Sequence, residues 1–389
     1  MTGFGKTIYL DNNATTAIDP AVLEAMRPFL EEFFGNPSSG YRLAARVRDA
    51  IEQARAQVAE LLGCEAAEII FTSGGTESNN TAFYSALQPP SDRKHVVTTA
   101  VEHSAVLRPA QELERRGYDV TFVGVDGSGR LDLKRLADAI RPDTALVSVM
   151  WANNETGVIF PIEEIAQIAR DKNVVFHTDA IQAAGKVDIK LRDMSAQFLS
   201  ISGHKLHAPK GVGALYVNRR ARFRPLLLGG SHEGNRRAGT ENAASIVALG
   251  KAAELARTKS RDEQVRIRQM RDRFEAMLLN KVPNARVNGA GTERLPNTSS
   301  ILFDGIESEA ALLMLDQENI CCSAGSACRT GSLKPSHVLS AMGLIGEEAR
   351  GSLRFSFGRF NTDDDVDRAL EVVPRVVTKL RALSPVVAN

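Results

Sequence analysis

The stretch that decides the fold is Phe198-Leu199-Ser200-Ile201-Ser202-Gly203-His204-Lys205, an apolar run followed at once by Ser-Gly-His-Lys. The run Phe198–Ile201 predicts a buried strand, whose end delivers Lys205 to a place with little water. Burial disfavours an ammonium, so the neutral and nucleophilic amine becomes more accessible and can form a Schiff base. Lys210 competes for this role, but it lies between a proline and a glycine, which predicts an exposed turn. We therefore favour Lys205.

A second apolar run ends in a carboxylate. Val174–Phe176 leads into His177-Thr178-Asp179, so a strand is expected to deliver Asp179 to the same edge of the sheet. A lysine that forms a Schiff base and a carboxylate that faces a pyridinium nitrogen are the partners of pyridoxal phosphate (PLP). The alternative for Asp179 is the N-cap of a helix over Ala180–Ala184. Together the two strand ends predict a PLP site.

The order of the elements predicts an α/β fold. From about residue 44 to 260, short apolar runs alternate with amphipathic stretches, which favours a mostly parallel sheet covered by helices. Ligands of such sheets bind at the carboxyl ends of the strands. Gly213–Val217 follows Phe198–Ile201 closely enough to pair with it in antiparallel fashion. Residues 251–280 predict a charged helix that joins two domains, and the pattern after Pro283 predicts a smaller α+β domain.

The composition is that of an ordinary globular protein. The chain has 389 residues, of which 43% are hydrophobic and 24% charged, and its net charge is +1. This balance gives no electrostatic argument for a nucleic-acid or membrane partner. No apolar stretch approaches the roughly 20 residues that span a bilayer, and no secretory signal precedes the first predicted strand. We therefore expect a cytoplasmic protein.

Three of the four cysteines, Cys321, Cys322 and Cys328, lie close together near the C-terminal end, whereas Cys64 stands apart. No C-x-x-C pair is present, which argues against a structural zinc site, and we expect no metal. Cys321 and Cys322 follow an apolar residue and are interpreted as buried, inert thiols. Cys328 lies in the small-residue segment Ser323–Ser332, which predicts a mobile surface loop, and Arg329 beside it favours the thiolate.

Two further motifs follow predicted strands. Ser73-Gly74-Gly75-Thr76 lies where a strand turns into a helix, so its backbone amides and the Thr76 hydroxyl could hold a phosphate. The alternative is a plain turn with Thr76 as the N-cap. His103 follows Val96–Thr99 and could stack on a cofactor ring and carry protons, or be a hydrogen-bonded structural histidine.

Asn154 and Arg354 complete the candidates drawn from residue types. Asn153-Asn154-Glu155 closes the strand Ala145–Met150, where these polar side chains either build a turn or face a ligand. Arg354 alternates with apolar residues on a half-buried strand. A substrate carboxylate would be a good bidentate partner for it, and an internal salt bridge is the alternative.

Together these motifs resemble the cysteine desulfurases of the NifS/IscS type, PLP enzymes of the class V aminotransferase-like group. The resemblance covers nearly the whole chain and is closer to NifS than to IscS. It is carried by Tyr9–Thr16, Gly35–Ser38, Gly325–Cys328, Gly331–Leu333, Pro335–Leu339 and Gly358–Phe360. It implies the type I fold of PLP-dependent transferases. The large PLP-binding domain would be residues 16–258, and a small domain of residues 1–15 and 259–389 would carry the catalytic cysteine loop.

The resemblance also implies a role for each matching residue. The catalytic residues are Lys205, which holds the cofactor, Cys328, the nucleophile, and His103, which stacks on the ring. The cofactor-binding residues are Gly75, Thr76, Asn154, Asp179, Gln182, Ser202, His204, Lys205 and Thr240. Among these, Thr240 matches a threonine that reaches the phosphate site of the second subunit of a homodimer. Arg354 binds the substrate carboxylate, with help from Asn154 and from the loop of Asn36.

The implied reaction converts L-cysteine to L-alanine and leaves the sulfur as a persulfide on Cys328. The sulfur then passes to an acceptor protein, such as an iron–sulfur cluster scaffold on which Cys328 helps to ligate a cluster transiently, or enters another thio-cofactor. Two alternatives remain open: a selenocysteine lyase or other class V PLP enzyme, and a non-catalytic sulfur-carrier scaffold of the same fold.

The sequence departs from the family pattern at three positions. Asn235 stands where the pattern usually has glycine, and we expect the turn to survive because asparagine tolerates a left-handed backbone. Ala324 and Arg329 replace a serine and a small hydroxyl residue near Cys328. Arg329 adds a charge beside the thiol that is expected to affect the choice of acceptor, whereas the core chemistry should be unchanged.

Overall fold

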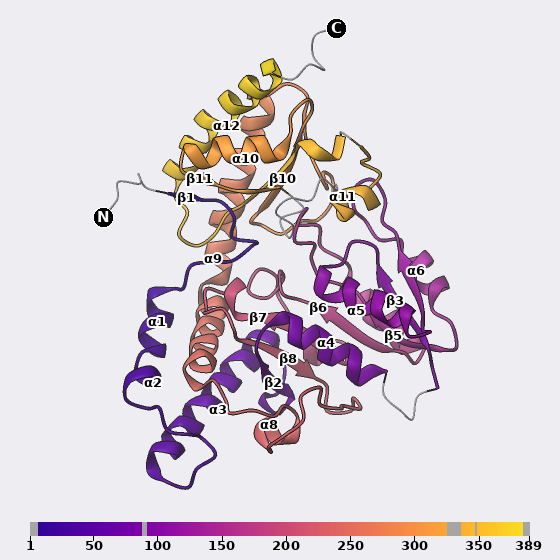
Figure 1. The fold of residues 1–389 in the computed structure, drawn as a ribbon, viewed down its shortest axis with the longest axis vertical. Coiled ribbons are helices and arrows are strands. Elements are labelled where there is room, and N and C mark those ends of the chain that lie inside the picture. The colour runs from indigo at the N-terminus through magenta and orange to yellow at the C-terminus, as the bar shows by residue number, and fades with distance from the viewer. Residues whose placement is uncertain (1–6, 88–91, 325–335, 347, 384–389) are drawn as a thin grey trace.

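The computed structural model describes residues 7–87, 92–324, 336–346 and 348–383. A large layered body occupies the lower part of Figure 1 and a smaller one the upper part, and the long helix α9 (Ala243–Lys281) runs between them. Cys328 and most of its predicted loop lie outside the described residues.

The larger body is built on a central sheet. Within the described residues seven strands pair in the order β2-β8-β7-β6-β5-β3-β4. Their bounds are β2 Ile69–Thr72, β3 His95–Thr99, β4 Asp119–Val123, β5 Thr144–Ser148, β6 Val175–Asp179, β7 Phe198–Ser202 and β8 Gly213–Val217. β8 is antiparallel to both of its neighbours, and the other pairs are parallel. The prediction of a mostly parallel sheet, with Gly213–Val217 antiparallel to its neighbour, is confirmed.

Helices cover this sheet, so β2, β3, β5, β7 and β8 are buried at every position. The helices of the larger body are α1 Pro20–Met26, α2 Pro28–Glu31, α3 Arg42–Leu62, α4 Gly75–Ala86, α5 Ser104–Arg115, α6 Leu133–Ala139, α7 Ile162–Asp171 and α8 His232–Asn235. α4 packs on β6, β7, β8 and α5. Its N-terminal residues lie beside Ser202 at the end of β7 and Gly213 at the start of β8.

The smaller body contains an antiparallel sheet in the order β12-β13-β10-β9. Its strands are β9 Ala285–Val287, β10 Thr298–Phe303, β12 Ser323–Ala324 and β13 Ser352–Ser356. Beside it, β1 (Ile8–Tyr9) pairs in parallel with β11 (Ile320–Cys321), so the N-terminal segment joins the C-terminal part of the chain. The helices are α10 Ser308–Gln317, α11 His337–Ala341 and α12 Asp363–Leu383. The predicted α+β pattern after Pro283 is confirmed.

α9 is the helix predicted to join the two parts, although it is longer than residues 251–280. Its N-cap Asn242 accepts a bond from the backbone N–H of Ser245. Ile246 and Leu249 belong to the core of the larger body, whereas Met270 and Phe274 belong to that of the smaller one. One helix therefore fixes the two cores relative to each other.

None of the described helices combines the length and the apolar composition that crossing a bilayer requires.

Candidate active site

The predicted site residues gather at one edge of the central sheet. Asp179 ends β6, Lys205 follows β7, His103 follows β3 and Asn154 follows β5. β2 has the same direction as β7 because both pair antiparallel with β8, and Thr72 and Ser202 both lie opposite Gly213. Gly75, just after β2, therefore reaches the same edge. This is where ligands of parallel sheets bind.

The carboxylate of Asp179 is buried, with 4% of the residue exposed. Its Oδ2 accepts a 2.7 Å bond from the amide of Asn79, and its Oδ1 accepts a 3.0 Å bond from the backbone N–H of Ile181. Burial raises the pKa of the Asp179 carboxyl, while His103 and the hydrogen bonds oppose that shift. Residues 181–186 form turns rather than a helix, so the N-cap alternative for Asp179 is wrong.

Lys205 lies in a short 3-10 turn, η3 (Gly203–Lys205), directly after β7. Its Nζ donates a hydrogen bond to the carbonyl oxygen of Asn13 and another, of 2.7 Å, to that of Ala14. These carbonyls hold the amine beside the sheet edge. Lys210 is exposed in a turn, as predicted.

The N-terminus of α4 forms a cradle suited to an anion. The N-cap is Gly74, with φ 147°, so the alternative of Thr76 as N-cap is wrong. A Cβ on Gly75 would approach Ile181 Cδ1 to 2.0 Å, which excludes a side chain there without repacking. Ser202 is buried and lies beside this turn. Its Oγ would be 3.8 Å from a Cβ atom added to Gly74. Thr76 is exposed, and with its neighbours it offers the first amides of the helix.

His204, predicted to help hold the phosphate, lies beside this cradle. Its Nδ1 is 3.2 Å from the hydroxyl of Thr15. Burial lowers its pKa to about 4, and the charge of Lys205 adds to that effect. At neutral pH the ring is therefore uncharged, and it could hold a phosphate by hydrogen bonding rather than by charge.

His103 is fixed by the helix that follows it. It is the N-cap of α5, and its Nδ1 accepts a 3.1 Å bond from the backbone N–H of Ala105. Burial lowers its pKa, so the ring is neutral at physiological pH and carries its hydrogen on Nε2. The structural and catalytic interpretations of His103 are therefore compatible, because the cap uses only one ring nitrogen.

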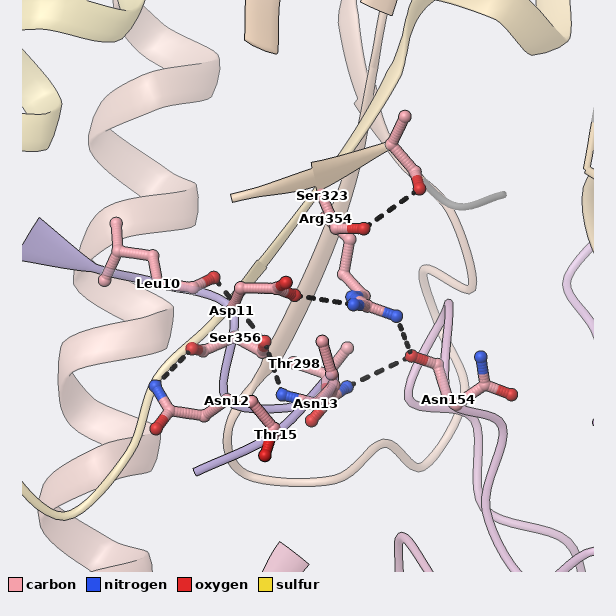
Figure 2. A network of polar contacts seen from close by, with 12 residues as sticks. Leu10, Asp11, Asn12, Asn13, Thr15, Asn154, Thr298, Ser323, Arg354 and Ser356 are labelled. Atoms are coloured by element: carbon pink, nitrogen blue, oxygen red, sulfur yellow. Dashed lines mark hydrogen bonds and ion pairs between the residues drawn. The ribbon is translucent and has the colours of Figure 1, made fainter. Parts of the chain in front are cut away.

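Arg354 lies on β13, with 3% of its side chain exposed, and makes two polar contacts that Figure 2 shows. Its Nη2 donates to Asp11 Oδ1 over 2.6 Å, and its Nη1 donates to the backbone oxygen of Asn154 over 2.9 Å. The internal salt bridge left open by the sequence is thus present. Within the described residues, however, the buried Nε has no hydrogen-bond partner. A buried donor without a partner points to a ligand, and a substrate carboxylate would satisfy it.

Asn13 joins the two bodies at the site, and sequence analysis did not single it out. Its side chain contacts Thr298 of β10 at 2.8 Å and Asn297 at 2.9 Å. Its amide nitrogen also donates to the backbone oxygen of Asn154 over 3.2 Å (Figure 2). Its carbonyl oxygen accepts bonds from Lys205 and from the Gln182 amide, the latter over 2.9 Å. The only signal was its place in the Tyr9–Thr16 motif.

Asn79 and Glu102 were also missed. Asn79 lies one turn into α4, where spacing from the glycine motif could have suggested that it faces the site. Glu102 Oε1 accepts bonds from Thr99 at the end of β3 and from the N–H of Met150 after β5. Burial raises the pKa of Glu102 to about 8. It ties together the two strand ends that carry His103 and Asn154.

Three predicted residues are not brought to this edge within the described chain. Asn36 is exposed in the loop between α2 and α3, where its Oδ1 accepts a 2.9 Å bond from the N–H of Ser38. Thr240 is exposed in the loop before α9. Cys328 lies outside the described residues. The roles of these three stay predictions.

The loop that leads to Thr240 is anchored to the larger body by ion pairs. Arg55 of α3 makes a buried bidentate pair with Glu233, with contacts of 2.7 and 2.8 Å. Arg237 pairs with Glu77 of α4 at 2.9 Å. Glu233, Gly234 and Asn235 all have positive φ, with 65° at Asn235, so the expected tolerance of asparagine in this turn is confirmed.

The groups at the sheet edge fit PLP. A pyridinium nitrogen needs a buried anion, which Asp179 supplies; a phosphate needs the amides of a helix N-terminus, which α4 supplies; and the cofactor aldehyde needs Lys205. The Asn79 amide oxygen is buried and has no partner among the described residues, as expected of a site built around a further polar group.

Comparison with known proteins agrees with this geometry. The family model described as "Aminotransferase class-V" matches residues 8–369. The chain is 54% identical to "Cysteine desulfurase 2" of Trichormus variabilis, over 98% of this chain and 95% of that protein. It is 52% identical to "Cysteine desulfurase NifS" of Azotobacter vinelandii, over 97% of this chain and 94% of that protein.

Solved structures give the same result. A structure titled "NIFS-LIKE PROTEIN" superposes with a TM-score of 0.91 at 34% identity, covering 96% of this chain and 100% of the other. "SspA in complex with cysteine" gives a TM-score of 0.80 at 35% identity, covering 92% and 100%. The chain therefore belongs to the class-V aminotransferase family and, within it, to the PLP-dependent cysteine desulfurases of the NifS type.

Proposed function

We propose that this chain converts L-cysteine to L-alanine and takes up the sulfur as a persulfide on Cys328. The observation that carries the proposal is the meeting of Lys205, the buried Asp179 and the unpartnered Nε of Arg354 around one sheet edge. Relatives named cysteine desulfurase match over nearly the whole chain. The reaction balances without an added oxidant: L-cysteine and a thiol give L-alanine and a persulfide.

PLP bound at Lys205 supplies an electron sink for the pair left behind when a proton leaves the substrate Cα. Asp179 would hold the hydrogen on the ring nitrogen, and the neutral ring of His103 would pack against the cofactor ring. The Gln182 amide would bind the ring oxygen. The amine of Lys205, once released, accepts the Cα proton.

Cys328 acts in the second half of the reaction. Its thiolate attacks the sulfur of the substrate, so that an S–S bond forms and the Cβ–S bond breaks. The electron pair of the broken bond stays on Cβ, where a proton completes the methyl group of alanine. Arg354 and the Asn154 segment hold the substrate carboxylate during these steps.

Arg354→Lys should raise the KM for L-cysteine roughly 10- to 100-fold, because an ammonium cannot reproduce the bidentate geometry of a guanidinium. The charge that balances Asp11 is kept, so the cofactor's visible absorbance should not change. Steady-state kinetics with an absorption spectrum tests this. Arg286→Lys on β9, whose side chain is exposed, is the matched control. An unchanged KM would assign Arg354 to the Asp11 salt bridge alone.

The proposed reaction itself is tested by the product ratio. Purified protein given L-cysteine and a thiol reductant should release one alanine for each sulfide. Sulfide without alanine would contradict a desulfurase, since elimination would then give pyruvate instead. Faster turnover of selenocysteine, together with loss of dependence on Cys328, would favour the selenocysteine lyase alternative.

The proposal includes a homodimer in which Thr240 completes the phosphate site of the partner subunit. Large apolar side chains are exposed near the Asn36 loop and before the Thr240 loop: Leu30, Phe34, Tyr41, Leu227 and Leu228. Such clusters often mark protein interfaces. Sedimentation should show a dimer, and a monomer that is fully active would contradict this part.

The domain division at residues 16–258 against 1–15 and 259–389 is also proposed, with the two separate cores in its support. Val338, Leu339 and Met342 nevertheless pack in the core of the larger body, so the segment after the cysteine loop bridges the division. The sulfur acceptor is proposed to be a cluster scaffold or another thiol protein, reached in the cytoplasm.

A further inference from the structure

Lys186 is a second lysine behind the site, and the proposed mechanism gives it no role. It lies one turn after Gln182, and its Nζ donates a 3.1 Å bond to Gln182 Oε1. The amide nitrogen of Gln182 donates in turn to the carbonyl oxygen of Asn13 over 2.9 Å. The same carbonyl accepts a bond from Lys205 Nζ. The two lysines are thus joined through one side-chain amide and one backbone oxygen.

The two lysines also share a cavity of about 50 Å³ between the two bodies. The charged groups around it are Lys186, Lys205, Glu263 and Arg359. Glu263 is already paired with Arg359 at 3.1 Å, and Arg359 also pairs with Asp19 at 2.7 Å. In the part of the chain that the structure describes, no carboxylate lies within ion-pair distance of Lys186. The amine of Lys186 is therefore placed among cations without an anion of its own.

Burial, with smaller contributions from the charges of Lys205 and Arg354, lowers the pKa of Lys186 to about 7. His204 and His207 also face this charge, and both have their own pKa lowered to about 4, chiefly by burial. A charge on either lysine opposes a charge on the other, because like charges that line one poorly hydrated cavity repel each other.

We propose that Lys186 is a positioning residue whose charge keeps the nitrogen of Lys205 unprotonated and whose hydrogen bond fixes the amide of Gln182. A lysine beside another cation is an effective nucleophile and base, which is what the proposed Lys205 must be. The amide is fixed because Lys186 only donates and the Asn13 carbonyl only accepts, so Gln182 has one allowed orientation. The inference rests on the proposed function in taking Lys205 as the cofactor lysine.

The test is the pH titration of the holoenzyme's visible absorbance, which follows the proton on the nitrogen that joins Lys205 to the cofactor. Lys186→Met removes the neighbouring cation, so the midpoint should move to higher pH by about one unit. Lys186→Arg keeps a permanent charge, so its midpoint should equal that of the unmodified protein or lie below it. Lys190→Met is the control, because Lys190 is exposed and paired with Asp188 at 2.9 Å. The acid limb of the kcat profile should shift with the midpoint.

Equal midpoints in all variants would overturn the proposal, as would a Lys186→Arg shift in the same direction as Lys186→Met, which would indicate packing alone. If Lys186→Met does not fold, Lys186→Gln, which keeps a donor without the charge, gives the same comparison. Loss of the visible band in Lys205→Ala, combined with an unmoved midpoint in Lys186→Met, would reject the role of Lys186 and leave the proposed function intact. A band that persists in Lys205→Ala would reject both.

Discussion

Lys205→Ala is expected to lower desulfurase activity roughly 10³-fold or more and to remove the visible absorbance of the bound cofactor. The loss is large because the amine of Lys205 has two functions: it holds the cofactor, and it accepts the substrate proton. No neighbouring group can replace it. Lys186 is bonded to the far side of Gln182, and Lys210 is exposed in a turn.

An absorption spectrum and an alanine assay on the same preparation test this result. Lys210→Ala is the matched control, because it removes a lysine of the same loop and should leave both readouts unchanged. Free cofactor can still occupy the cradle at Gly75, so weak binding without the visible band would agree with the account. A visible band of normal intensity in Lys205→Ala would show that another amine holds the cofactor.

Cys328→Ser is expected to abolish sulfide release while leaving the cofactor spectrum unchanged. A hydroxyl cannot accept sulfur from the substrate as a thiolate does, whereas the groups proposed to hold the cofactor lie elsewhere in the chain. The expected loss is at least 10³-fold in kcat, because the nucleophile itself is removed. Spectral changes on adding L-cysteine should persist, since the first half of the reaction does not use Cys328.

The other cysteines provide the controls. Burial raises the pKa of the Cys64 thiol to about 12, and burial also raises the pKa of Cys321, so both stay protonated and poorly nucleophilic. Cys321→Ser should therefore keep its activity. Normal sulfide release by Cys328→Ser would contradict the assignment of the nucleophile.

Much of the fold follows from local patterns. The alternation of apolar runs with amphipathic stretches predicts the strands of the central sheet, because strands buried on both faces are rich in apolar residues. The bridging helix was predicted from its charged helical pattern, yet its start at Ala243 was missed. Its first turns are rich in small apolar residues that pack in the core of the larger body and do not show the charged pattern.

Most of the site was also predictable. Residues that follow parallel strands meet at one edge of the sheet, regardless of how the loops connect the strands. Gly75, His103, Asp179 and Lys205 lie together for this reason. Contacts between segments far apart in the sequence do not follow from it. The pairing of Arg354 with Asp11 and the junction at Asn13 depend on how the smaller body sits against the larger one, and no local pattern encodes that.

Local sequence patterns also do not predict the roles of residues that depend on a second subunit. Asn36 and Thr240 are exposed within one chain, and only the resemblance to the family assigns them a role at the site. The link between Lys186 and Lys205 was missed for a different reason. A lysine after a Gln-x-x-Gly turn looks like a surface residue in sequence, and only the packing of the two bodies shows that its amine is buried.

The central claim is that sulfur passes from L-cysteine to Cys328. The most direct measurement is mass spectrometry of the intact protein and its peptides after a single turnover with sulfur-labelled L-cysteine and no reductant. The account predicts one labelled sulfur atom on the peptide that contains Cys328, together with one alanine per sulfur. Labelled sulfide in solution with Cys328 unmodified, or label on Cys321 or Cys322 instead, would contradict it.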